Sequence, residues 1–307
     1  MTAPDIGIFL PTMADADGTP GDVVAAARQI EDLGFESAWV VDQLVAGAGA
    51  PLVDSGLALA AAAAVTERVR LAYGVAIVPL RPTVWLAKQV ASLQHLSGAR
   101  AILGVGAGGD RHTLSWEAAG VPVRERGRRL DAALRVLPSL IAGEATVLAD
   151  EPGSPTVRLA PGVAVPPLVI GGMSAAAERR VVEHDAEWFL VPFGPDGTRQ
   201  ARDRIGERAA AAGKPLPLLT ASTMLAIEGD PALPSPDEVR ALVADPRGRF
   251  GMPADAVDDV VVRGGPEVAA AHLASLAEAG AHRVVVTIAA GDWHRQVDLL
   301  AEAVALL

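Results

Sequence analysis

The sequence contains no cysteine, and lysine occurs only at Lys88 and Lys214 among 26 basic residues. The lack of cysteine excludes disulfides, thiolate metal sites, iron–sulfur ligation and a cysteine nucleophile. We expect Lys88 in a helix and Lys214 in a turn, where neither fits the lysine of Schiff-base chemistry. The histidines show no H-x-x-x-H or H-E-x-x-H spacing, so we also expect no metal site.

Long apolar runs are missing as well, because the alanine-rich run 56–65 is too short to span a bilayer. The first residues lack the basic segment of a signal peptide. The net charge of −11 disfavours nucleic acid and anionic membranes as partners. We therefore expect a cytoplasmic protein that acts on a small molecule.

Short β-branched runs alternate with amphipathic stretches, which is the pattern of a parallel sheet covered by helices. With 307 residues, the pattern predicts a single-domain (β/α)₈ TIM barrel over residues 1–307. The predicted strands are 6–10, 37–41, 69–78, 100–106, 168–171, 188–191, 218–227 and 284–288. The predicted helices are 22–33, 57–65, 83–96, 125–141, 175–184, 199–212, 266–279 and 293–307.

Two longer stretches interrupt this alternation, as insertions after strands four and seven. Residues 142–165 contain closely spaced prolines and glycines and predict a hairpin, and residues 229–265 carry a short helical piece at 237–243. Long insertions after a barrel strand usually lie at the catalytic face. We expect both segments to act as lids, the alternative being plain surface loops.

A glycine-rich segment, residues 104–109, satisfies G-x-G-x-x-G after a predicted strand. A dinucleotide-binding Rossmann motif opens a helix in the first βαβ unit, whereas this segment closes the fourth strand and is followed by polar residues. We therefore interpret the glycines as letting a flat ring lie against the backbone at the barrel mouth.

Six stretches spread over nearly the whole chain carry a family resemblance, namely residues 8–12, 32–44, 66–79, 87–100, 166–174 and 186–189. In them the sequence resembles the luciferase-like monooxygenase family of flavin- and F420-dependent oxidoreductases. The resemblance implies the same barrel and a tricyclic cofactor, either the deazaflavin coenzyme F420 or FMN.

The resemblance also implies the residues around the cofactor ring. A non-proline cis peptide is expected at Gly74–Val75 in the third strand, backing the ring, and the glycine segment contributes Gly106, Ala107 and Gly108. Asp42 and Gln43, at the end of the second strand, match a pair that contacts the ring. Many members have histidine where this chain has Gln43, and an amide exchanges no proton near neutral pH.

A second departure is Gly109, where sugar-phosphate dehydrogenases of the family place an acidic proton donor, so their substrate is not carried over. His112, in the loop after the glycine segment, is the remaining acid–base candidate, and the alternative is an ordinary exposed histidine. Gly171, Gly172, Met173 and Ser174 precede a predicted helix whose N-terminus suits a cofactor phosphate. Ser174 also fits a simple N-cap, and the two roles are compatible.

Four aromatic side chains are candidates for pocket walls. We expect Trp85 and Trp188 to belong to the core, and leave the core and pocket interpretations open for Trp116 and Phe193.

Three functions remain in competition. The first is hydride transfer between F420 and a small organic substrate. The arginine- and alanine-rich composition suggests a GC-rich bacterial genome, in which a deazaflavin coenzyme is plausible. The second is FMN-dependent monooxygenation, and the third is a catalytically weak barrel that binds a flavin without turnover. A homodimer is compatible with the resemblance.

Overall fold

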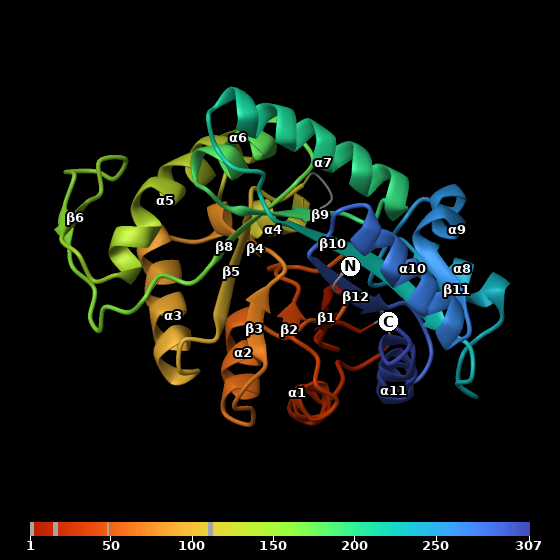
Figure 1. The fold of residues 1–307 in the computed structure, drawn as a ribbon. Helices are drawn as coiled ribbons and strands as arrows, with labels where there is room; N and C mark the ends of the chain where they lie inside the picture. Colours follow the sequence, from red (N-terminus) through yellow and green to blue (C-terminus); the bar gives the residue numbers. More distant parts are fainter. Residues whose placement is uncertain (1–2, 15–17, 48, 110–112) are drawn as a thin grey trace.

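The computed structural model describes residues 3–14, 18–47, 49–109 and 113–307. Eight parallel strands form a closed barrel in which β1 pairs with β2 and β12, and β9 closes the ring by pairing with β10. Figure 1 shows these strands at the centre of the molecule. The TIM-barrel prediction is therefore confirmed. The barrel strands are β1 (Asp5–Phe9), β2 (Ser37–Val40), β3 (Arg70–Tyr73), β5 (Ala101–Gly106), β8 (Leu168–Gly171), β9 (Glu187–Leu190), β10 (Leu219–Ile227) and β12 (Arg283–Ile288).

Helices surround the strands, and the main core lies between the two layers (Figure 1). Several helices begin at a side-chain cap: Asp22, Asp54 and Asp292 each accept a hydrogen bond from a backbone N–H of the first turn. The outer helices are α1 (Val23–Asp32), α2 (Ser55–Ala63), α3 (Thr83–Leu96), α5 (Arg126–Ile141), α6 (Ala175–Glu183), α7 (Gly194–Ala211), α10 (Pro266–Glu278) and α11 (Trp293–Val304). Within the described residues, no helix is both long and apolar enough to cross a membrane.

Some elements differ from the prediction or were not predicted. The expected strand 69–78 is interrupted after β3, and its second part is the short β4 (Ala76–Ile77) followed by a 3₁₀ turn, η1 (Val78–Leu80). The helix α4 (Thr113–Ala118) and the 3₁₀ turn η3 (Val123–Glu125) lie between β5 and α5. Neither was predicted, because a six-residue helix is too short to show a periodic pattern.

The insertion 142–165 does contain a hairpin, formed by β6 (Thr146–Val147) and β7 (Thr156–Val157). It connects the end of α5 with the beginning of β8, so it is attached at the amino-terminal side of the barrel. Figure 1 shows β6 projecting at the left, far from β11, α8 and α9. A lid must cover the carboxyl ends of the strands, so this placement speaks against the expected lid role of the segment.

The insertion 229–265 follows β10 at its carboxyl end. It contains α8 (Pro236–Ala244), the 3₁₀ turn η4 (Ala254–Ala256), α9 (Val257–Val260) and β11 (Val261–Gly264), which pairs with the last residues of β10. Its loop also reaches the barrel, since the Arg249 guanidinium donates to the carbonyl of Ala289, after β12, at 3.2 Å. This segment has the placement that a lid requires.

The amino-terminal end of the barrel holds a buried charged network. The Arg283 guanidinium donates to Glu36 Oε1 and Oε2 at 3.0 Å each, and to Glu187 Oε2 at 2.7 Å. Thr220 Oγ accepts a further bond at 3.2 Å. Burial alone raises the pKa of Glu187, but its bonds to His282 and Arg283 outweigh burial and hold the pKa below its ordinary value.

Candidate active site

The bulge between β3 and β4 is the centre of the candidate site. The peptide bond between Gly74 and Val75 is cis, which confirms the expectation from the family resemblance. A β-carbon added at Gly74 would lie 2.8 Å from the Phe9 ring and 2.9 Å from Trp39 Cε3. The bulge therefore rests directly on aromatic rings inside the barrel.

Three glycines of neighbouring strands surround the Val75 side chain. An added β-carbon would lie 2.8 Å from Val75 Cγ2 at Gly106, 2.9 Å from it at Gly171, and 2.9 Å from Val75 Cγ1 at Gly104. All three distances are shorter than ordinary carbon contacts of about 3.5–4.0 Å. We call Gly104, Gly106 and Gly171 the glycine cradle. The glycines of β5 therefore also make room for protein atoms: Gly106 for Val75, and Gly104 for Val75 and for the Tyr73 carbonyl oxygen, which would lie even closer to an added β-carbon.

An aromatic cluster fills the barrel beside the bulge. The Trp39 ring lies 5.4 Å from the Phe189 ring and 6.4 Å from the Phe9 ring, between centroids. Trp39 is fixed by its Nε1–H, which donates to Ser37 Oγ at 2.7 Å. Phe9 and Val75 are half-buried and pack against the buried Trp39 and Phe189, so the floor of the site is apolar.

Asp42 lies just after β2 and is 6% exposed. Its Oδ1 accepts from Ser55 Oγ at 2.7 Å, and its Oδ2 accepts from the backbone N–H of Ile77 at 2.7 Å. The Arg81 Nη2 lies 2.7 Å from both oxygens. A carboxylate offers about four acceptor positions, and protein donors occupy all of them. The contact with the cofactor ring that the resemblance implies for Asp42 stays a prediction, and these donors give the carboxylate a structural role as well.

Gln43 follows Asp42 and is half-buried. Its side-chain amide has no hydrogen-bond partner among the described residues, so it retains both a donor and an acceptor for a ligand. The loop after it is tied down by Ser115 of α4, whose Oγ accepts from the Val45 N–H at 3.0 Å and donates to the Val45 carbonyl at 3.2 Å. Gln43 thus remains a candidate for contact with the ring.

The glycine segment continues past β5 with Ala107 and Gly108. Gly108 has φ 74°, and an added β-carbon would lie 2.8 Å from Trp116 Cζ2, so Trp116 packs tightly against this turn. Trp116 is only 2% exposed and its Nε1–H donates to the Gly109 carbonyl at 3.3 Å. The structure thus favours the core interpretation of Trp116. His112 lies outside the described residues.

Gly171, Gly172, Met173 and Ser174 lead from β8 into α6, as predicted. The Ser174 Oγ accepts from the Ala177 N–H at 3.2 Å, which confirms the N-cap. The two N–H groups before it in the first turn, at residues 175 and 176, have no acceptor among the described residues. This exposed helix start, with its partial positive charge, keeps the geometry that suits a phosphate.

Two arginines of this helix are already paired. Arg180 Nε donates to Asp131 Oδ1 at 2.7 Å, and Arg179 bonds both Asp131 and Glu183. Their bonds lower the pKa of Asp131 below its ordinary value, the Arg180 hydrogen bond contributing most. The pairs hold α6 against α5, so a phosphate would be bound by the backbone of α6 rather than by these side chains.

The remaining aromatic candidates divide differently than expected. Trp188 is buried, as predicted, and its Nε1–H donates to the Gly172 carbonyl at 2.8 Å. Trp85 is 66% exposed on α3, so its assignment to the core was wrong. Phe193, after β9, is 48% exposed and remains a candidate for the pocket wall.

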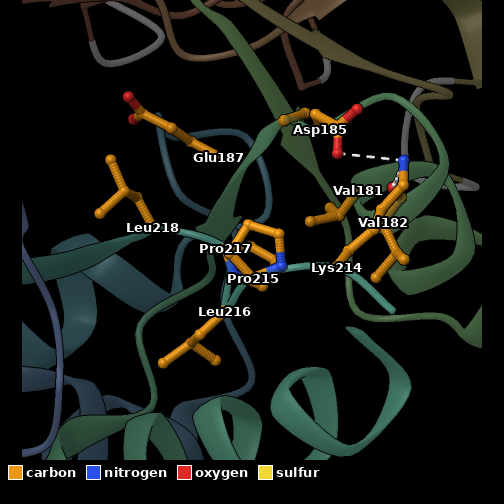
Figure 2. A pocket seen from close by; sticks show the side chains of 10 residues that line it. Val181, Val182, Asp185, Glu187, Lys214, Pro215, Leu216, Pro217 and Leu218 are labelled. Carbon is orange, nitrogen blue, oxygen red and sulfur yellow. Dashed lines mark hydrogen bonds and ion pairs between the residues drawn. The ribbon is translucent and has the colours of Figure 1, made fainter. Parts of the chain in front are cut away.

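A separate cleft lies at the other end of the barrel. Figure 2 shows Pro215, Leu216 and Pro217 forming one side of it, with Val181 and Val182 of α6 opposite. Lys214 Nζ lies 3.0 Å from Asp185 Oδ1 at its edge. Because this cleft lies at the start of β9, it is remote from the carboxyl ends of the strands. Among the described residues no group of three or more histidine or acidic side chains suits a metal ion.

The fold and the site together define an α/β-barrel protein with an apolar, glycine-lined mouth. A model of the luciferase-like monooxygenase family matches residues 5–305, and the chain belongs to this family. An uncharacterized protein of Mycobacterium tuberculosis is 33% identical over 175 residues, which are 55% of this chain and 58% of that relative's length.

Solved structures of both cofactor types share the fold. An F420-dependent secondary alcohol dehydrogenase in complex with an F420-acetone adduct has a TM-score of 0.78 and 17% identity, over 98% of each chain. The oxygenating constituent of 3,6-diketocamphane monooxygenase from Pseudomonas putida, in complex with FMN, has a TM-score of 0.74 and 17% identity. That alignment covers 99% of this chain and 96% of the other.

Proposed function

We propose that this protein is an F420-dependent oxidoreductase that transfers a hydride between the deazaflavin and a small organic substrate. The observation that carries the proposal is the mouth itself, where the Val75 bulge, the glycine cradle and the unpartnered Gln43 amide lie around one apolar floor. When bound, the cofactor supplies hydride chemistry at carbon 5 of its ring. The residues of the mouth fit such a cofactor, because a planar ring needs a flat apolar support and a few polar contacts.

Each part of the mouth has its own task. The half-buried Val75 side chain supports one face of the ring, and the aromatic floor of Phe9, Trp39 and Phe189 excludes water from below. Gln43 orients the ring or the substrate by hydrogen bonds and holds its protons throughout. The exposed start of α6 binds the phosphate through backbone N–H groups.

The chemistry at the end of β2 favours hydride transfer over FMN-dependent monooxygenation. Asp42 is fully used by protein donors, and the neighbouring Gln43 amide does not exchange protons near neutral pH. Hydride transfer depends chiefly on the position of two carbon atoms, which a non-titrating side chain serves well. Solved structures with either cofactor share the fold of this chain, one with F420 and one with FMN, so monooxygenation stays the second candidate.

Titration of the purified protein with F420 and with FMN under matched conditions tests the proposal. We expect saturable quenching of F420 fluorescence and a much weaker response to FMN. A yellow protein with flavin fluorescence would support the monooxygenase instead. Tight F420 binding without turnover on any panel of alcohols, aldehydes and imines would support the catalytically weak barrel, and no binding of either cofactor at millimolar concentration would refute all three.

We also propose that the chain is a single domain in which 229–265 alone acts as a lid, and that two copies associate. Chains of net charge −11 repel one another except where their surfaces are neutral. The helix α2 has no charged residue, yet Leu57 on it is 70% exposed, beside α3 with its exposed Trp85. This apolar face, uncharged along α2, offers a second copy a surface with little repulsion.

A further inference from the structure

The Asp42 side chain joins three separate segments of the chain at the edge of the candidate site. It bonds Ser55 at the start of α2, the Ile77 N–H in β4, and the Arg81 side chain after η1. The Arg81–Asp42 pair is largely buried, with side-chain exposures of 22% and 3%. Charged hydrogen bonds at such distances are among the strong ones in proteins.

The positions of these bonds relative to the mouth indicate what Asp42 does. Ile77 follows Val75 by two residues, so the bond to its N–H fixes the backbone just after the bulge. Gln43 follows Asp42 directly, so the same carboxylate fixes the backbone that carries the unpartnered amide. One side chain thus sets the distance between the two elements that we propose to flank the cofactor ring.

We propose that Asp42 is a positioning residue, which holds the Gln43 amide and the Val75 bulge in register without touching the cofactor. This rests on the proposed function for the identity of the ligand, but the clamp itself is a property of the protein alone. Ser55, Ile77 and Arg81 are its partners, and Arg81 neutralises the charge so that none of it faces the ring.

The first test uses the cofactor-free protein. Asp42→Asn keeps the shape of the side chain but places an NH₂ group against donors, so hydrogen–deuterium exchange over residues 74–81 is expected to accelerate at least tenfold. Asp54→Asn is the matched control. Asp54 is an exposed carboxylate next to Ser55 at the start of α2, where it accepts from the Leu57 N–H at 2.9 Å, and it has no bond to residues 74–81. Unchanged exchange in Asp42→Asn would overturn the clamp.

The second test uses a double-mutant cycle to decide whether Asp42 acts through Gln43. Gln43→Ala and Asp42→Asn are each expected to weaken F420 binding about tenfold, the scale of one hydrogen bond. If Asp42 acts by placing Gln43, the double variant binds about as weakly as Asp42→Asn alone. A loss of roughly a hundredfold in the double variant, the product of the two single losses, would show that Asp42 acts independently of Gln43 and would overturn the proposal that it places this amide.

A third variant covers the case in which Asp42→Asn does not fold. Ser55→Ala removes one bond of the clamp and leaves the ion pair intact, and we expect the same changes in exchange and binding at a smaller size, about threefold. Unchanged exchange over 74–81 in that variant would count against the clamp. If wild-type protein binds neither F420 nor FMN, the proposed function fails, while the exchange experiment still decides whether the clamp exists.

Discussion

Gly171→Ala is the sharpest test of the glycine cradle. The new methyl group would lie 2.9 Å from Val75 Cγ2 and 3.3 Å from Val75 Cγ1, and no backbone atom is among its nearest neighbours. Ordinary carbon contacts begin at about 3.5 Å, so Val75 must move by about half an ångström. The backbone of Gly171 does not have positive φ, so a new side chain adds no backbone strain.

Overpacking of this kind costs about 1–3 kcal/mol of the free energy of unfolding. With an unfolding entropy of about 2.1 cal/mol/K per residue, the chain loses roughly 2–5 °C in Tm. Calorimetry measures the Tm, and a fluorescence titration measures F420 binding, which we expect to weaken because Val75 is displaced towards the ring. Gly206→Ala is the control, since an added β-carbon there meets only Leu216 Cδ1 at 3.4 Å and lies in α7.

The double variant Val75→Ala/Gly171→Ala tests whether Val75 is the residue that Gly171 accommodates. Removing both γ-carbons leaves the new methyl group without a close neighbour, so Gly171→Ala should cost less than about 0.5 kcal/mol in the Val75→Ala background. If the two substitutions instead add their separate costs, Val75 is not what the cradle accommodates, and the interpretation of the three glycines is refuted.

Three further predictions concern the rest of the molecule. Arg283→Met removes the buried cation between Glu36 and Glu187, whose remaining ion-pair contacts among the described residues are the longer ones to Arg70 at 3.7 Å and to His282 at 3.5 Å. The variant should lower the free energy of unfolding by about 3–5 kcal/mol in urea titrations, and a loss under 1 kcal/mol contradicts the network. The pKa of Glu187 is lowered on folding, so its stabilisation is present above its ordinary pKa of 4.5 and disappears as the pH falls through the lower folded pKa. Glu187→Gln should therefore flatten the dependence of the unfolding free energy on pH below about pH 5, and an unchanged pH dependence speaks against this. Leu57→Glu combined with Trp85→Glu should yield monomers by light scattering, whereas persistent dimers exclude the α2–α3 face.

The framework of strands and helices follows closely from local sequence signals. Both α3 and β8 have the predicted bounds, because Pro82 precedes the helix, Ser97 and Gly98 end it, and prolines and glycines flank the strand. The placement of the segment 142–165 could also have been predicted from the order of the elements. It follows a helix rather than a strand, and this order alone places it at the amino-terminal side of the barrel.

The site was less predictable, because its contacts join distant parts of the chain. The partners of Asp42 lie 13, 35 and 39 residues away, and no local pattern shows that its four acceptor positions are filled. The exposure of Trp85 has a similar cause. The periodicity of α3 shows that the helix has an apolar side but not how far that side extends around it. The Gly74–Val75 bulge was predicted in position through the family resemblance, and the Ser174 N-cap through its local sequence.

The barrel divides its tasks along its axis, and the link between the two ends is short. The Arg283 guanidinium lies 5.9 Å from the Trp39 ring, and the same ring supports Gly74 at the bulge. The position of Trp39 has a second constraint, however, because its Nε1–H donates to Ser37 Oγ. Methionine at position 283 also keeps most of the side-chain volume. We therefore expect Arg283→Met to lower stability while leaving the Kd for F420 within about twofold, since a change under 0.5 kcal/mol corresponds to that factor. A tenfold weaker Kd would show instead that the charged network sets the floor of the site.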